Sequence, residues 1–203
     1  MGQGDKPWWA GLGGQWRGVT LALVAATAGL WVMPAYAAFE FEGRKTVYAV
    51  AADGTRTPVA ALHFEKTGQA GQATFKLDLE VEKFTDFFLS MREFKCLPND
   101  KEITCYVPYP YEQPGTVRAD DLRWLEHSLL FFYKTPAEFG ANLWNGLYFE
   151  FKADGNALVG APAAVDLNEI SAPPEDLTVP PYSEDLRHEM PADARWIRQL
   201  VIE

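Results

Sequence analysis

Apolar and polar residues alternate along much of the chain after residue 37, and this alternation predicts antiparallel β-strands. The most regular segment is 73–82, ATFKLDLEVE, where apolar residues occupy every second position from Phe75 to Val81 and charged residues fill the positions between them. A period of two places one side of a strand on a core and the other side in water. We therefore expect a sheet with one solvated face.

Two Asp-Gly turns, Asp53-Gly54 and Asp154-Gly155, predict β-hairpins. The alternating segments that flank them are 45–50 and 57–65 for the first turn, and 146–152 and 156–165 for the second. Asp-Gly between apolar alternations is a strong hairpin signal because both residues tolerate a positive φ. The last residues, 195–203, alternate again, so we expect this part of the chain to return to the sheet.

Two further segments carry helical spacing. Segment 119–136 places Leu122, Leu125, Leu129 and Phe132 on one stripe, which predicts an amphipathic helix that Pro136 ends. Between Phe84 and Phe94 both helical spacing and alternation occur. We favour a strand over 87–96 there, because this segment leads into a turn-rich hairpin.

The pattern as a whole predicts an α+β fold. We expect a mainly antiparallel curved sheet or small β-barrel of about seven or eight strands, with one amphipathic helix packed on it. The alternation does not distinguish an open sheet from a closed barrel. Residues 38–203 suit a single domain, and the proline-rich segment 171–191 is expected to wrap along its surface.

The first 37 residues have the pattern of a secretory signal peptide. An uncharged apolar run, 19–33, follows Lys6 and Arg17 and precedes the sequence PAYA at 34–37. A run of this length is short for a membrane-spanning helix, which needs about 20 apolar residues. We expect cleavage after Ala37 and a periplasmic protein, with secretion as the alternative. An uncleaved N-terminal anchor is the weaker interpretation.

The protein is strongly acidic, and this limits the classes of partner that it can bind. The full chain carries a net charge of −10, and removal of Lys6, Arg17 and Asp5 with the signal peptide makes it −11. An acidic surface repels phosphate backbones, and no basic stripe occurs in the sequence. We therefore expect no nucleic-acid partner. The oligomeric state is not predicted.

The two cysteines, Cys96 and Cys105, are expected to form a disulfide. Export would place them in an oxidising compartment, and the intervening Pro98-Asn99-Asp100 favours a turn. Zinc would need two further soft ligands, whereas the three histidines are widely scattered. The spacing also differs from the C-x-x-C motif of thiol oxidoreductases. We expect neither a metal nor another cofactor.

No known catalytic motif occurs in the chain. Glu126 and His127 are adjacent, but successive helical positions point about 100° apart, so they are expected on a solvated helix flank. His63 lies on a predicted strand and is either a pocket residue or an ordinary sheet residue. We therefore favour a non-catalytic protein.

Aromatic residues beside amides are the strongest binding signal. They occur where strands are expected to end, and such groups stack on ligands or anchor interfaces. The candidate binding residues are Tyr106, Tyr109, Tyr111, Asn142, Trp144, Asn145, Tyr148 and His63. The plainer alternative is that Phe139 and Trp144 plug the end of the sheet while the tyrosines cover a loop.

Three functions compete on this basis. The leading hypothesis is non-catalytic binding of a small ligand or partner at an aromatic-rimmed end of the sheet. The alternatives are an acidic inhibitor or chaperone-like protein that meets a basic partner, and a hydrolase of envelope material.

Overall fold

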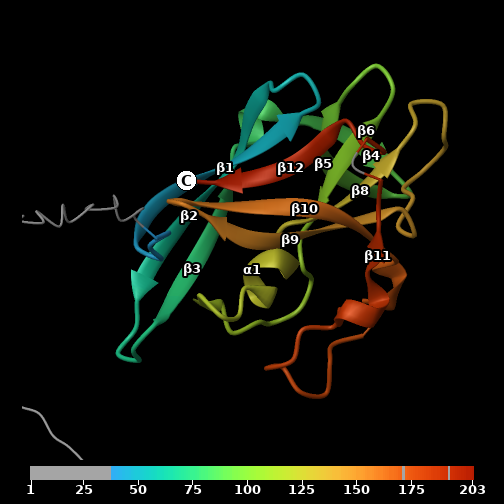
Figure 1. Ribbon diagram of the computed structural model, residues 1–203. Helices are drawn as coiled ribbons and strands as arrows, with labels where there is room; N and C mark the ends of the chain where they lie inside the picture. Colours follow the sequence, from blue (N-terminus) through green and yellow to red (C-terminus); the bar gives the residue numbers. More distant parts are fainter. Residues whose placement is uncertain (1–37, 171, 192) are drawn as a thin grey trace, which may run out of the picture. The chain divides into compact units, whose positions relative to one another are not determined.

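The computed structural model describes residues 38–170, 172–191 and 193–203 (Figure 1). The predicted signal peptide, residues 1–37, lies outside this part of the chain, so the structure does not bear on it.

The strands join in one twelve-stranded sheet. In chain order they are β1 (Gly43–Ala51), β2 (Arg56–Lys66), β3 (Gln72–Leu79), β4 (Thr85–Leu89), β5 (Arg92–Pro98), β6 (Ile103–Val107), β7 (Thr116–Arg118), β8 (Leu130–Lys134), β9 (Gly146–Asp154), β10 (Ala157–Val165), β11 (His188–Glu189) and β12 (Ile197–Ile202). Their spatial order is β4-β5-β6-β8-β9-β10-β12-β1-β2-β3-β7, with β11 paired to β10. All the pairs are antiparallel.

The prediction of an α+β fold with seven or eight strands and a packed amphipathic helix was wrong. Besides the twelve strands, the described residues contain one five-residue α-helix, α1 (Arg123–His127), and three 3-10 turns, η1 (Val81–Lys83), η2 (Leu167–Glu169) and η3 (Glu184–Leu186). The protein is therefore mostly antiparallel β-sheet.

The prediction of a helix over 119–136 was mostly wrong. Only its middle is helical, and its apolar second half is the strand β8. Within β8, Leu130 and Phe132 join one hydrophobic cluster and Phe131 joins another. Side chains of successive strand residues point to opposite faces, so β8 is buried on both faces. A strand of this kind is a continuous apolar run, which a helical stripe also fits.

The segment 87–96 is extended as expected, but it is not one strand. It forms the hairpin β4–β5, which turns at Ser90 and Met91 with φ values of 47° and 65°. Positive φ values are uncommon for residues other than glycine, asparagine and aspartate. The turn consequently carries no recognisable sequence signal.

The other strand predictions are confirmed. The two Asp-Gly turns connect β1 with β2 and β9 with β10, and the last strand, β12, lies between β10 and β1. Segment 73–82 provides β3, which ends at Leu79.

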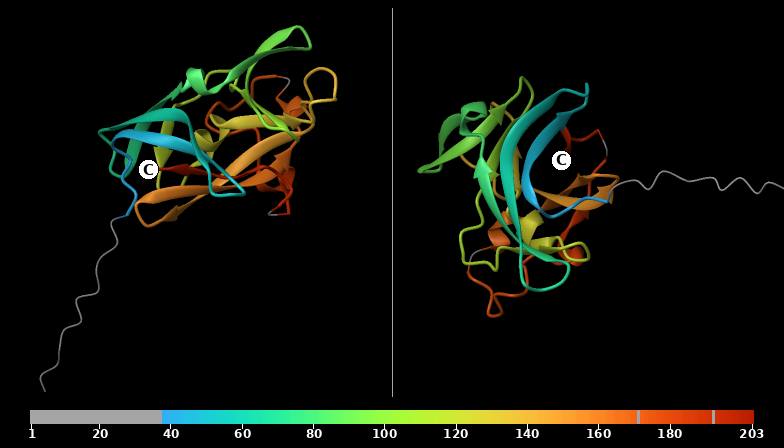
Figure 2. Two further views of the ribbon diagram at one scale, coloured as in Figure 1. Left: turned by 90° about the horizontal axis from the view of Figure 1, so that it is seen from above. Right: turned by 90° about the vertical axis from the view of Figure 1, so that its left-hand side faces the viewer.

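The sheet bends so strongly that α1 lies inside its curl (Figures 1 and 2). The helix contacts both β9, in the middle of the strand order, and β7, at its end. Leu125 and Leu129 enter the main core beside Val47, Val59 and Leu62. This core fills the inside of the curl, and the second cluster covers the other face of β5, β6, β8 and β9.

Candidate functional site

A cleft opens where β5 and β6 separate. The two strands pair over three positions only: Cys96 with Cys105, Leu97 with Thr104, and Pro98 with Ile103. Beyond the cysteines, residues 92–95 pair with β4, whereas Tyr106 and Val107 pair with β8. Pro108 and Pro110 follow, and proline cannot donate to a ladder. We call the resulting cavity, of about 720 Å³, the β5–β6 cleft.

The predicted disulfide between Cys96 and Cys105 is present, and it closes the apex of this cleft. The two cysteines are the last residues that pair before the strands diverge. Their Cα atoms are 3.9 Å apart, so the covalent bond fixes the point at which the cleft begins. The disulfide is therefore part of the site as well as of the hairpin.

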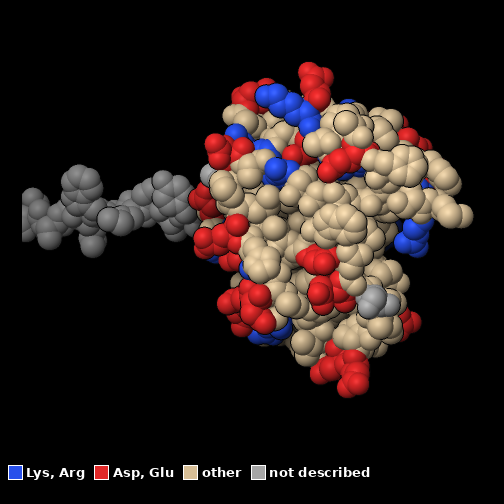
Figure 3. Space-filling view, turned by 90° about the vertical axis from the view of Figure 1, so that its right-hand side faces the viewer, with Lys and Arg blue, Asp and Glu red and all other residues tan. Residues whose placement is uncertain are grey.

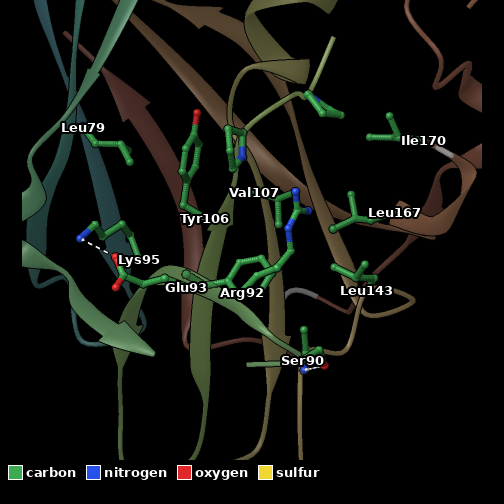
Figure 4. A pocket seen from close by; sticks show the side chains of 14 residues that line it. Leu79, Ser90, Arg92, Glu93, Lys95, Tyr106, Val107, Leu143, Leu167 and Ile170 are labelled. Atoms are coloured by element: carbon green, nitrogen blue, oxygen red, sulfur yellow. Dashed lines mark hydrogen bonds and ion pairs between the residues drawn. The ribbon is translucent and has the colours of Figure 1, made fainter. Parts of the chain in front are cut away.

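The cleft reaches both faces of the sheet. On the β5 side it is lined by the consecutive residues 92–95, whose side chains alternate in direction. Figure 4 shows Arg92 extending into the cavity toward Val107, Leu143 and Leu167, while Glu93 and Lys95 lie at the other end. The cavity thus follows the edges of two strands.

The lining is mostly apolar. Its apolar members are Leu79, Phe94, Tyr106, Val107, Pro108, Pro110, Ala141, Leu143, Leu167 and Ile170. Ser90 and the charged side chains of β5 complete it.

The charged residues that line the cleft differ in their partners. Lys95 lies 3.5 Å from the Glu93 carboxylate and donates a hydrogen bond to Asp86, and this bond raises the pKa of the ammonium. Arg92 makes no hydrogen bond or ion pair with any residue that the structure describes. A guanidinium has five donors and stays charged. Arg92 is therefore the one cleft cation whose donors are available to a ligand, as far as the described residues show.

Tyr106, on β6, forms part of the cleft wall that faces β5. Its hydroxyl donates to the Ser128 carbonyl oxygen at 3.2 Å, and its ring packs edge-on against Phe131 at 5.7 Å. Burial raises the pKa of this phenol to about 12, so it stays protonated at neutral pH. Tyr106 is thus a fixed wall with its apolar ring toward the cavity.

Large apolar side chains are exposed on the segments that contribute Ser90, Arg92, Ala141 and Leu143 to the cleft, and we call them the rim residues. Phe88, Met91, Phe139 and Trp144 have relative exposures of 76%, 88%, 104% and 67%. They belong to the β4–β5 hairpin and to the loop before β9, which meet where the Ala141 N–H donates to the Ser90 hydroxyl at 2.9 Å. A Cβ at Gly140 would lie 2.8 Å from that hydroxyl oxygen, so this contact requires glycine. Exposed apolar groups gathered in one place mark interaction sites more often than single ones do.

The structure places the residues proposed from the sequence in different environments. Tyr106 lines the cleft and Trp144 lies at its rim, while Asn142 and Asn145 form a turn beside the lining residues. Tyr109 packs against Tyr111 and Trp124. The Tyr109 hydroxyl and the side-chain Oδ1 of Asn142 are buried and have no hydrogen-bond partner among the residues that the structure describes.

Tyr148 and His63 lie away from the cleft lining. Tyr148 is fully buried, and His63 is exposed on β2, 3.5 Å from Asp78. The role of all these residues in binding stays a prediction. The sequence reasoning missed Arg92, Leu143, Leu167 and Ile170, because only the fold brings their three segments together.

The expectation that Glu126 and His127 lie on a solvated flank was wrong, because both are buried. Glu126 accepts hydrogen bonds from the Tyr148 hydroxyl and from the Phe151 backbone N–H at 2.8 Å. Burial raises the pKa of its carboxyl group, against the effect of these two donors. β9 pairs with β8 only through Gly146 and Leu147, so Glu126 satisfies a backbone donor farther along β9. Its role is structural.

No group of three or more histidine, cysteine or acidic residues suited to a metal occurs in the described part of the chain. Among those residues, no helix is both long and apolar enough to cross a membrane. On the face drawn in Figure 3, basic side chains are scattered among acidic ones around a broad uncharged area. The sequence matches no protein-family model and has no significant match among curated proteins or solved structures.

Proposed function

We propose that the protein is a non-catalytic binding protein whose β5–β6 cleft holds a small amphipathic anion. The ligand would place an apolar body along the cleft and an anionic group at Arg92. The observation that carries this proposal is a guanidinium without a described protein partner, extending into a mostly apolar cavity. Such a cation orients an anion, and the apolar lining supplies the affinity.

The size and lining of the cleft support this class of ligand. Ligand pockets in proteins commonly measure about 300–1,000 Å³ and combine apolar walls with a few polar groups. The β5–β6 cleft, at about 720 Å³, lies within this range. The rim residues Phe88, Met91, Phe139 and Trp144 would cover the apolar body on entry.

An exported location is part of the same proposal. The signal-peptide pattern of residues 1–37 and the disulfide of Cys96 and Cys105 both favour an oxidising compartment. We place the protein in the periplasm, or outside the cell as the alternative.

The proposal can be tested with two probes of equal chain length and opposite charge, decanesulfonate and decyltrimethylammonium. Calorimetric titrations below their micelle concentrations should show saturable binding of the sulfonate and markedly weaker binding of the ammonium. Arg92→Gln should weaken sulfonate binding about tenfold or more, since a hydrogen bond to a charged group contributes about 1.5–3 kcal/mol.

Arg56→Gln is the matched control. Arg56, at the start of β2, pairs with Glu203, directly after β12, and neither residue lines the cleft, so its replacement should leave binding unchanged. Equal affinity for the two probes, or no binding of either, would reject the proposed ligand class.

A further inference from the structure

The first part of the proline-rich segment, residues 172–182, is hydrogen-bonded to the rest of the described protein through one tyrosine. We call residues 172–182 the strap. Pro180 and Tyr182 are its buried residues, while most of the others are exposed. Within the described residues, every hydrogen bond from the strap to other parts of the chain comes from Tyr182. The backbone N–H of Tyr182 donates to Nε2 of His127 at 3.1 Å.

The geometry around His127 defines its protonation state. Nδ1 lies 2.6 Å from the Arg123 carbonyl oxygen, which can only accept, so Nδ1 carries the hydrogen. Nε2 accepts from Tyr182 and therefore carries none. The imidazole also stacks on the Tyr182 ring, with centroids 5.4 Å apart and planes inclined by 20°. A second proton on Nε2 would place two hydrogens against each other and remove this bond.

Apart from the Arg123 carbonyl oxygen, which favours the protonated imidazole, the groups that face His127 act against its protonation or are neutral. On its own helix, Trp124 packs edge-on and the Arg123 guanidinium adds positive charge. The Tyr148 ring, on β9, packs edge-on against the imidazole. The guanidinium of Arg187, directly after η3, lies over the Tyr148 ring. The carboxylate of Glu126 is turned to Tyr148 and Phe151. Burial, opposed by the Arg123 carbonyl and assisted by the two guanidinium groups, lowers the pKa of His127 to about 4.

The same tyrosine supports one wall of the β5–β6 cleft. The Tyr182 hydroxyl donates to the Asp166 carbonyl oxygen at 3.0 Å. Asp166 is the N-cap of η2, and its carboxylate accepts from the Asn168 N–H at 2.9 Å. Leu167 in η2 and Ile170 directly after it are lining residues of the cleft. Tyr182 thus connects His127 to that wall.

We propose that His127 and Tyr182 form an acid-sensitive latch: protonation of His127 frees the strap, loosens the η2 wall and releases the ligand from the cleft. This regulation rests on the proposed function. The protein would hold its ligand at neutral pH and release it in acid. A periplasmic protein would meet such acid when the surroundings of the cell are acidified.

The experiment follows the latch and the ligand separately, from pH 7 to pH 3.5. The protection factor of the Tyr182 amide reports the latch; it is the intrinsic exchange rate at each pH divided by the rate that ¹⁵N NMR measures. Calorimetry with decanesulfonate reports binding, because a sulfonate stays ionised over this range. We expect the protection factor of the Tyr182 amide to fall at least tenfold near pH 4 and sulfonate affinity to fall at least tenfold with it.

His127→Gln is the decisive variant, because a glutamine oxygen can accept from Tyr182 but does not titrate. It should keep both readings nearly constant with pH, while the exposed His63→Gln should behave like the unaltered protein. Tyr182→Phe is the second variant. It removes only the bond to Asp166, so sulfonate affinity at pH 7 should fall while the residue 182 amide stays protected. Circular dichroism checks that every variant is folded.

The outcomes separate the two proposals. If the sulfonate never binds, the proposed function fails, and the amide exchange still tests the latch. An amide that stays protected at pH 3.5, or a response in His127→Gln equal to that of the unaltered protein, overturns the latch. A freed strap with unchanged affinity overturns its coupling to the cleft.

Discussion

At the scale of single residues, buried polar groups are where this protein departs most from its sequence pattern. Glu126 and His127 are adjacent polar residues that helical periodicity assigns to solvent, yet both are buried. Each has specific partners: Tyr148 and Phe151 for the carboxylate, and Arg123 and Tyr182 for the imidazole. Burial without such partners would be costly, so these contacts explain how the positions tolerate polar side chains.

His127 should make the stability of the protein depend on pH. Its pKa is lowered in the folded state to about 4 from an ordinary 6.5, so between these values the unfolded chain binds a proton that the native protein does not. The free energy of unfolding therefore falls as the pH falls from about 6.5 to about 4, and this group adds no further loss below that. The full effect is about 3 kcal/mol.

Urea unfolding at a series of pH values measures this contribution. His127→Gln should flatten the curve over that interval by most of that amount, whereas His63→Gln should not. If the two variants lose stability in parallel with the unaltered protein, His127 is not neutral and buried as described.

At the scale of elements, the sequence predicted hairpins well and strands that are buried on both faces poorly. Asp-Gly turns identify β1–β2 and β9–β10, because a tight turn imposes a local conformational requirement that particular residues satisfy. The turn at Ser90 and Met91 has the same need for positive φ but lacks the residues that usually meet it. The hydroxyl of Ser90 instead contacts the Ala141 N–H, which a local pattern does not reveal.

The disulfide should affect the cleft as well as stability. The double variant Cys96→Ser/Cys105→Ser removes a bond that closes a loop of about ten residues, and the chain-entropy model gives a loss of about 2–3 kcal/mol. We expect the protein to remain folded, because the core on the inside of the curl does not depend on this hairpin. Urea unfolding checks the loss of stability.

Binding of decanesulfonate by the same variant checks the second part of this prediction. The affinity should fall, because the disulfide fixes the apex at which β5 and β6 separate. The control is the unaltered protein with reductant, which should match the variant. Complete unfolding of either would show that the hairpin supports far more of the fold than its position indicates.

At the scale of the whole molecule, the curl of the sheet creates both the core and the site. The contacts of α1 with β7 and β9 close the curl around the main core. β5 and β6 lie near the other end of the strand order, and they separate there. Loops from two distant segments of the chain line the resulting cleft. The cleft is thus a property of the tertiary arrangement.

Export is the prediction that belongs to this scale. Expressed in a Gram-negative bacterium, the full chain should reach the periplasm without residues 1–37. Native mass spectrometry should give the mass of residues 38–203 less two hydrogens, and reductant should restore both. A full-length chain recovered with the membrane fraction would instead support an uncleaved anchor.

The sequence by itself determined the strand-rich character, the tight Asp-Gly turns and the cysteine pair, since each depends on neighbours along the chain. Only the tertiary structure decided that the apolar run of β8 is a strand, that Glu126 and His127 are buried, and that Arg92 faces Leu143 and Leu167 across a cleft. These features depend on which segments meet in space. Local periodicity records how a residue relates to its neighbours, whereas burial and a binding site arise from contacts between distant parts of the sheet.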